Sequence, residues 1–176
     1  MKRLFLTAMA VFAVSAMFVS CNKQEGDSSE ENDVTYTLFF NYGQSSDRGS
    51  DTQVLNDILD KAKELTVAAD IALYGGSKTE YPFNKELSAK TEKAAKAEYD
   101  KLVDQAKSEG AKIIAELNKM KEANAAAIAG YPKDMYVNLD FGLMLLKYTP
   151  GMIGGETVAE TDCGIFEVAG SKKAEK

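Results

Sequence analysis

The hydrophobic positions predict one long helix in the middle of the chain. From about residue 84 to 129, apolar or small side chains recur every three or four positions, and the opposite face is charged. Gly130 and Pro132 end this pattern, and Gly130 is expected to act as a left-handed cap. Ala106 and Gly110 leave room for a neighbouring backbone, although Gly110 can equally mark a break between two shorter helices. The apolar stripe consists of Ala95, Tyr99, Leu102, Ala106, Gly110, Ile113, Leu117, Met120, Asn124 and Ala127.

Alternating hydrophobic positions predict strands on both sides of this helix. Residues 34–42 read VTYTLFFNY, and residues 135–148 read MYVNLDFGLMLLKY. The second run becomes apolar on both faces near its end, which is typical of a central strand. Gly142 is a candidate bulge within it. A last strand at 164–168 is expected to pair back antiparallel.

A shorter helix is predicted after a loop at 43–50 that is rich in Gly, Ser and Asp. Its buried face has helical spacing up to Leu65. The next stretch, 66–74, alternates well enough to favour a strand slightly, while its alanines also suit a continued helix. The pattern therefore predicts an α+β domain at 34–170, with a frayed tail at 171–176. A small mixed or antiparallel sheet of three to four strands would pack against one long and one shorter helix.

The first 20 residues have the order of a secretory signal peptide. Lys2 and Arg3 precede an apolar run that is short for a membrane span. The run ends Phe18-Val19-Ser20-Cys21, which resembles the lipobox of bacterial lipoprotein precursors, with Phe18 in place of the usual Leu. The resemblance implies that Cys21 is lipidated and becomes the new N-terminus. Ordinary signal cleavage, for example after Ala16, is the alternative.

Residues 22–33 follow Cys21 as a polar, acidic segment. Five of these twelve residues are acidic and none is apolar, so a solvated tether is expected. An acidic run directly after the lipidated Cys resembles the export signal of Bacteroidota surface lipoproteins, and a plain spacer is the other interpretation. The expected location is the cell envelope, at the outer membrane, facing either the periplasm or the cell surface.

The charge and the residue types of the chain exclude several kinds of partner and of catalytic site. The net charge is −6, and removal of Lys2 and Arg3 with the leader leaves 19 basic and 27 acidic side chains, a net charge of −8. This balance argues against nucleic acid as a partner. The chain has no His, hence no imidazole base and no Ser–His–Asp triad. No phosphate-binding loop or EF-hand spacing occurs either, so no catalytic residue, metal site or cofactor is predicted.

A few residues remain as candidates for ligand binding. Asp140, an acid in an apolar strand, is either a perturbed functional carboxyl or a residue of the exposed sheet face. Tyr42 and Tyr74 lie near element ends, where aromatic rings can contact a ligand or simply line the core. Glu160 and Asp162 are candidate calcium ligands or residues of a solvated loop. With Cys21 lipidated, Cys163 is expected to be a small, buried, unpaired residue.

These features favour a non-catalytic lipoprotein that binds a partner protein in the envelope or supports an assembly, held to the membrane through Cys21. A holdase-like periplasmic chaperone is an alternative, because the long charged helix beside a small sheet is loosely similar to the Skp family. A hydrolase or lyase that uses only carboxylates is a second alternative, with Asp140 as its key residue.

Overall fold

The computed structural model describes residues 34–47, 52–75 and 84–172. The expected signal peptide, Cys21 and the tether therefore lie outside the described residues, as do residues 173–176 of the expected tail. In chain order the elements are β1 (Thr35–Asp47), α1 (Gln53–Tyr74), β2 (Asn84–Leu87), α2 (Glu92–Ala123), α3 (Ala125–Ala129), β3 (Tyr136–Tyr148) and β4 (Glu156–Ala169).

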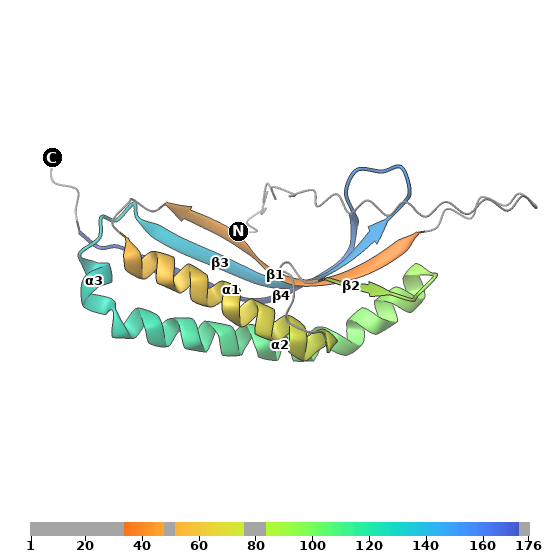
Figure 1. Ribbon diagram of the computed structural model, residues 1–176, viewed down its shortest axis with the longest axis horizontal. Helices are drawn as coiled ribbons and strands as arrows, with labels where there is room; N and C mark the ends of the chain where they lie inside the picture. The colour runs from red at the N-terminus through yellow and green to blue at the C-terminus, as the bar shows by residue number, and fades with distance from the viewer. Residues whose placement is uncertain (1–33, 48–51, 76–83, 173–176) are drawn as a thin grey trace, which may run out of the picture.

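The four strands form one antiparallel sheet in the order β2-β1-β3-β4. Helices α1 and α2 pack on one face of this sheet, and the strands bend so that the opposite face is concave (Figure 1). Two layers bury the apolar stripe of each helix against one face of the sheet. The predicted α+β class is confirmed, and the sheet is antiparallel.

The core lies between the sheet and the two helices. Alternate residues of β1 and β3 point into it, because successive side chains of a strand face opposite sides. The helices add residues at spacings of three and four, such as Leu55, Ile58 and Leu117. The largest fully buried side chains contributed by the strands are Phe40, Phe141, Phe166, Leu38, Leu139, Leu143, Leu145, Val137 and Val168.

The segment 66–74 is helical, so the slight preference for a strand was wrong. Thr66, Ala69, Asp70 and Leu73 are its buried residues, and their spacing continues the buried face of α1. Gly75 ends the helix in the left-handed conformation, at φ 70°, and its N–H donates to the carbonyl oxygen of Ile71 at 2.9 Å. The alternation was misleading because both of its faces contain small, helix-favouring alanines.

The long helix is confirmed but begins later than expected. Residues 84–87 form the short edge strand β2, in which Leu87 pairs with Tyr36 and is buried in the core. Thr91 is the N-cap of α2, and its Oγ1 accepts a hydrogen bond from the N–H of Ala94 at 3.3 Å. The helix then runs without a break through Gly110.

The end of the long helix also differs from the prediction. A turn at Asn124 separates α2 from α3, so the single helix to residue 129 was wrong. Gly130 has φ −76° and ψ −14°, a right-handed conformation, so the left-handed cap was wrong as well.

The strands are longer than the sequence suggested. β1 continues to Asp47 through the expected loop, and β4 begins at Glu156. Pairing with the long central strand β3 extends both, because each neighbour satisfies backbone hydrogen bonds that a loop would leave to water. Hydrogen bonds also hold the start of the expected tail, since the Lys172 N–H donates to the Tyr131 carbonyl oxygen at 2.9 Å.

Candidate binding surface on the concave face of the sheet

The concave face is formed by the strand residues that point away from the helices. On β3 these include Asp140, Gly142 and Met144, which alternate with the buried residues of the core. The antiparallel register aligns them with residues of both neighbouring strands. Three rows result, one through Phe39, Met144 and Glu160, one through Asn41, Gly142 and Asp162, and one through Gly43, Asp140 and Ile165.

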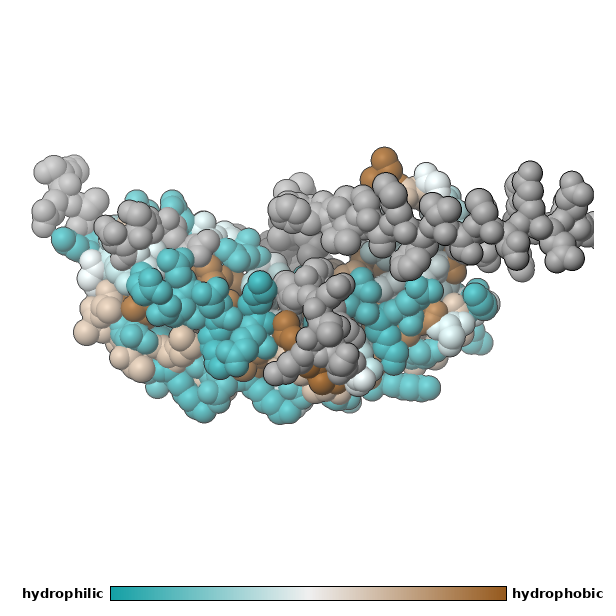
Figure 2. Space-filling view, in the orientation of Figure 1, coloured by the Kyte–Doolittle hydropathy of each residue, from teal (hydrophilic) through white to brown (hydrophobic). Residues whose placement is uncertain are grey.

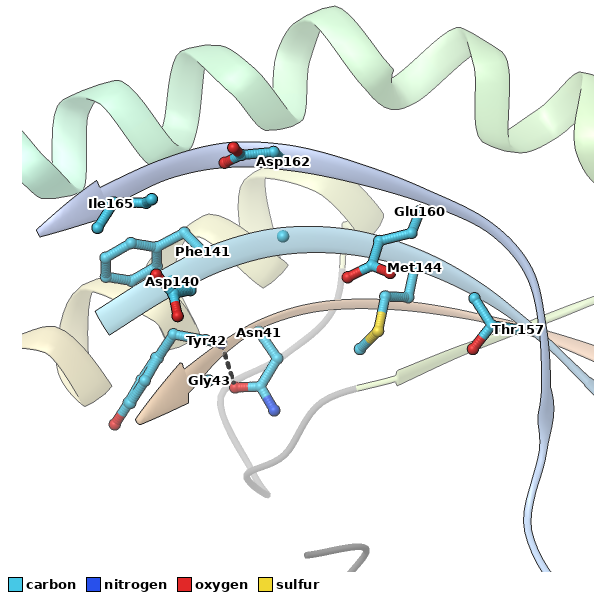
Figure 3. A pocket seen from close by; sticks show the side chains of 11 residues that line it. Asn41, Tyr42, Gly43, Asp140, Phe141, Met144, Thr157, Glu160, Asp162 and Ile165 are labelled. Carbon is cyan, nitrogen blue, oxygen red and sulfur yellow. Dashed lines mark hydrogen bonds between the residues drawn. The ribbon is translucent and has the colours of Figure 1, made fainter. Parts of the chain in front are cut away.

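Two glycines leave a hollow in the middle of these rows. Gly43 and Gly142 contribute only backbone, so the sheet surface is bare between the side chains around them. The resulting open pocket has a volume of about 540 Å³, within the usual range of small-ligand pockets. Figure 3 shows its lining side chains around the strands. The pocket is lined by Asn41, Tyr42, Gly43, Asp140, Phe141, Gly142, Met144, Thr157, Glu160, Asp162 and Ile165.

A bulge in β4 shapes one wall of this pocket. Phe141 pairs with Gly164, but Gly142 pairs with Asp162, so Cys163 is an extra residue in β4. The bulge therefore lies at the register of Gly142, as the sequence suggested, although the extra residue belongs to the neighbouring strand. It turns Cys163 into the core, while Asp162 is exposed and lines the pocket.

The pocket is acidic. Asp140, Glu160 and Asp162 contribute carboxylates, and none of the described lining residues is Lys or Arg. The pKa of Asp140 is raised, first by partial burial and then by the negative charges of Asp162 and Glu167. Like charges held together on one face favour a positively charged ligand, which would relieve their repulsion.

Asp140 and Tyr42 both line this pocket, but of the three candidate ligand residues only Asp140 has its side chain on the concave face. Asp140 is exposed on the concave face. The Tyr42 side chain is half-buried on the helix side of the sheet, because it alternates with Asn41 and Gly43. Its ring centroid lies 5.5 Å from that of the core residue Phe141. The Tyr42 backbone N–H donates to Asn41 Oδ1 at 2.8 Å (Figure 3).

Tyr74 lies elsewhere, in the interior between helices and sheet. Burial, together with the charge of Asp70 one helical turn earlier, raises the pKa of its hydroxyl. It therefore cannot meet a ligand bound on the concave face.

Glu160 and Asp162 belong to β4 and not to a loop, so the solvated-loop interpretation was wrong. Asp162 Oδ1 accepts a hydrogen bond from the Gly164 N–H at 2.7 Å. Within the described parts of the chain, no three or more His, Cys, Asp and Glu side chains are grouped to hold a metal ion. The alternation along β4 was the signal that could have assigned both carboxylates to a sheet face, but the register was needed to align them with Asp140.

A second polar group of residues is enclosed on the helix side of the sheet. The hydroxyls of Tyr99 and Thr161 lie 2.5 Å apart, and Tyr99 also donates to the carbonyl oxygen of Leu143 at 3.4 Å. Asp70 is only 1% exposed, has no hydrogen-bond partner among the described residues, and has its pKa raised by burial to about 8. The free thiol of Cys163 is buried as expected, and burial raises its pKa to about 11, so it is protonated and weakly nucleophilic at neutral pH.

Comparison with known proteins identifies no relative. No family model matches the sequence, and neither a curated protein nor a solved structure matches the chain. The described helices include none with the length and apolar character needed to cross a bilayer.

Proposed function

We propose that this chain is a lipid-anchored envelope protein whose domain binds a positively charged segment of a partner protein on its concave sheet face. Lipid on Cys21 would hold the domain at the outer membrane, and residues 22–33 would act as the tether. The single observation that supports binding is the acidic pocket of about 540 Å³ around Gly43 and Gly142.

The chemistry of the pocket favours Lys or Arg side chains as the occupants. Asp140, Glu160 and Asp162 would pair with their charged ends, and the apolar surfaces of Met144 and Ile165 would contact their hydrocarbon stems. Charge complementarity of this kind increases the rate of association and selects among partners more than it increases affinity.

Two experiments test the two halves of this proposal. Mass spectrometry of the mature N-terminus, purified from a bacterium that processes lipoproteins, should find residues 1–20 removed and Cys21 acylated. A soluble, acyl-free chain that begins at residue 17 would contradict the anchor.

Binding is tested with labelled peptides of equal length that are rich in Lys and Arg, uncharged, or rich in Glu. Fluorescence anisotropy should detect salt-sensitive binding of the basic peptide alone. The triple variant Asp140→Asn, Glu160→Gln, Asp162→Asn should weaken it about tenfold or more.

A matched control also removes three negative charges, but from the helix side of the molecule. It is the triple variant Asp60→Asn, Asp104→Asn, Glu122→Gln, whose residues are exposed on α1 and α2. It should bind the basic peptide as the wild type does. Equal weakening in both triple variants would contradict a site on the concave face.

A carboxylate-dependent hydrolase or lyase is the second candidate, favoured by the raised pKa of Asp140, which partial burial causes first and the charges of Asp162 and Glu167 increase further. Loss of a measured turnover in Asp140→Asn, with peptide binding retained, would support this candidate over a binding module. The holdase alternative gains no support from the long helix. It packs along the sheet, and the described residues form no helical pair that projects from the domain (Figure 1).

A further inference from the structure

The hairpin between β3 and β4 exposes two large apolar side chains at its tip. Met152 is 69% exposed and Ile153 is fully exposed, at 103%. No charged residue occurs from Tyr148 to Gly155. Figure 2 shows this tip as a small hydrophobic cluster at the top of the molecule. The free energy falls when another apolar phase covers apolar side chains at an exposed loop tip, because their surface is removed from water.

The hairpin lies at the end of the sheet where the chain leaves the described domain toward Cys21. Thr35, the first residue of β1, pairs with Tyr148, the last residue of β3. Only residues 22–33 separate Cys21 from the start of the domain at Val34. The thirteen Cα–Cα steps from Cys21 to Val34 span at most about 47 Å when fully extended. Lipid on Cys21 would therefore keep this end of the sheet within that distance of the bilayer and within reach of it.

We propose that Met152 and Ile153 insert into the same bilayer that holds the acyl chains of Cys21. The inference rests on the proposed lipidation, and it adds a second contact that would orient the domain on the membrane. Insertion would depend on apolar burial and not on charge, because the chain is acidic overall. Glu156 and Lys147, at the base of the hairpin, would stay at the level of the headgroups.

The chain contains no Trp, which allows a direct test. The lipidated full chain carrying Ile153→Trp is reconstituted into vesicles of phosphatidylethanolamine and phosphatidylcholine, with and without brominated acyl chains. Its emission should shift to the blue and be quenched by bromine in the acyl region. The control is Ile165→Trp, which replaces an exposed side chain on the concave face and should show neither effect.

A second substitution tests whether the hairpin tip enters the bilayer or only lies near its surface. Met152→Asp, added to the Ile153→Trp reporter, should abolish the quenching, because a carboxylate at the tip opposes entry into hydrocarbon. Both residues are exposed, so circular dichroism should show an unchanged fold.

The outcomes distinguish this inference from the anchor on which it rests. A vesicle-bound, acylated protein with an unquenched Trp at position 153 would overturn insertion and leave the anchor intact. Absence of acyl chains on Cys21 would remove the anchor itself. A blue shift that depends on protein concentration without lipid would assign the tip to contact with a second copy, and would also overturn the proposal.

Discussion

Gly110 of α2 packs directly against the backbone of Cys163 in β4. A Cβ atom on Gly110 would lie 2.9 Å from the Cβ of Cys163 and closer still to its carbonyl oxygen. The bulge that turns Cys163 toward the helix and the missing side chain of Gly110 therefore fit together. The long helix can approach the edge strand closely only at such a position.

We predict that Gly110→Ala destabilises the domain. Overpacking at this contact should lower the free energy of unfolding by about 1–3 kcal/mol. This cost should exceed the gain of about 1 kcal/mol in helix propensity. Urea denaturation followed by circular dichroism measures the change. Gly43→Ala is the control, because a Cβ there meets nothing within 4 Å, and a more stable Gly110→Ala variant would contradict the contact.

The buried carboxyl of Asp70 should make stability depend on pH. Its pKa is raised from 3.8 to about 8, so the folded state holds a proton that the unfolded state releases. Its contribution to stability should be greatest below about pH 4, fall as the pH rises to about 8, and then level off. Asp70→Asn should flatten this slope and stabilise the protein above pH 8 by several kcal/mol, at about 1.4 kcal/mol per pKa unit.

Urea denaturation of wild type and Asp70→Asn at pH 5, 7 and 9 checks this pH dependence. Asp60→Asn, an exposed residue of the same helix, should retain the wild-type slope. If Asp70→Asn keeps that slope as well, another group causes the pH dependence.

The pKa of Asp140 should depend on the charge of its neighbour Asp162. Burial raises the pKa of Asp140 first, and the charge of Asp162 adds to it. Asp162→Asn removes that charge, so the pKa of Asp140 should fall toward its ordinary value. Nuclear magnetic resonance titration of the carboxyl carbons measures it. Glu156→Gln, near the other end of β4, should leave the pKa of Asp140 unchanged, and an equal effect of both variants would argue against specific coupling.

The thiol of Cys163 should react slowly with a disulfide reagent in the folded protein. Burial raises its pKa to about 11, so at pH 7 only about one molecule in 10,000 holds the thiolate. Its reaction should be at least about 100-fold slower than that of Ser108→Cys, an exposed position on α2. The rate should increase when urea unfolds the domain. Similar rates for both thiols in the folded state would show that Cys163 is accessible.

Several features of the candidate site could be inferred from the sequence, and others could not. Alternation along residues 135–148 was enough to place Asp140 opposite the buried face of its strand. No local signal shows that Asp162 lies beside Gly142, because that contact depends on the β3–β4 register and on a bulge. Tyr74 is kept from the concave face by the packing of α1 on the other side of the sheet, although all three candidates looked alike in the sequence.

The amino-acid sequence by itself determined the α+β class, the long amphipathic helix and the central strand, because each depends on a periodicity within one continuous segment. The tertiary structure decided that residues 66–74 are helical and that residues 84–87 form a strand. The first segment is locally ambiguous and the second was predicted as the start of the long helix, but α1 gains by extending its buried face and β2 gains by pairing with β1. It also decided where the pocket lies, since Asn41, Gly142 and Asp162 are far apart in the chain and meet only when the strands pair.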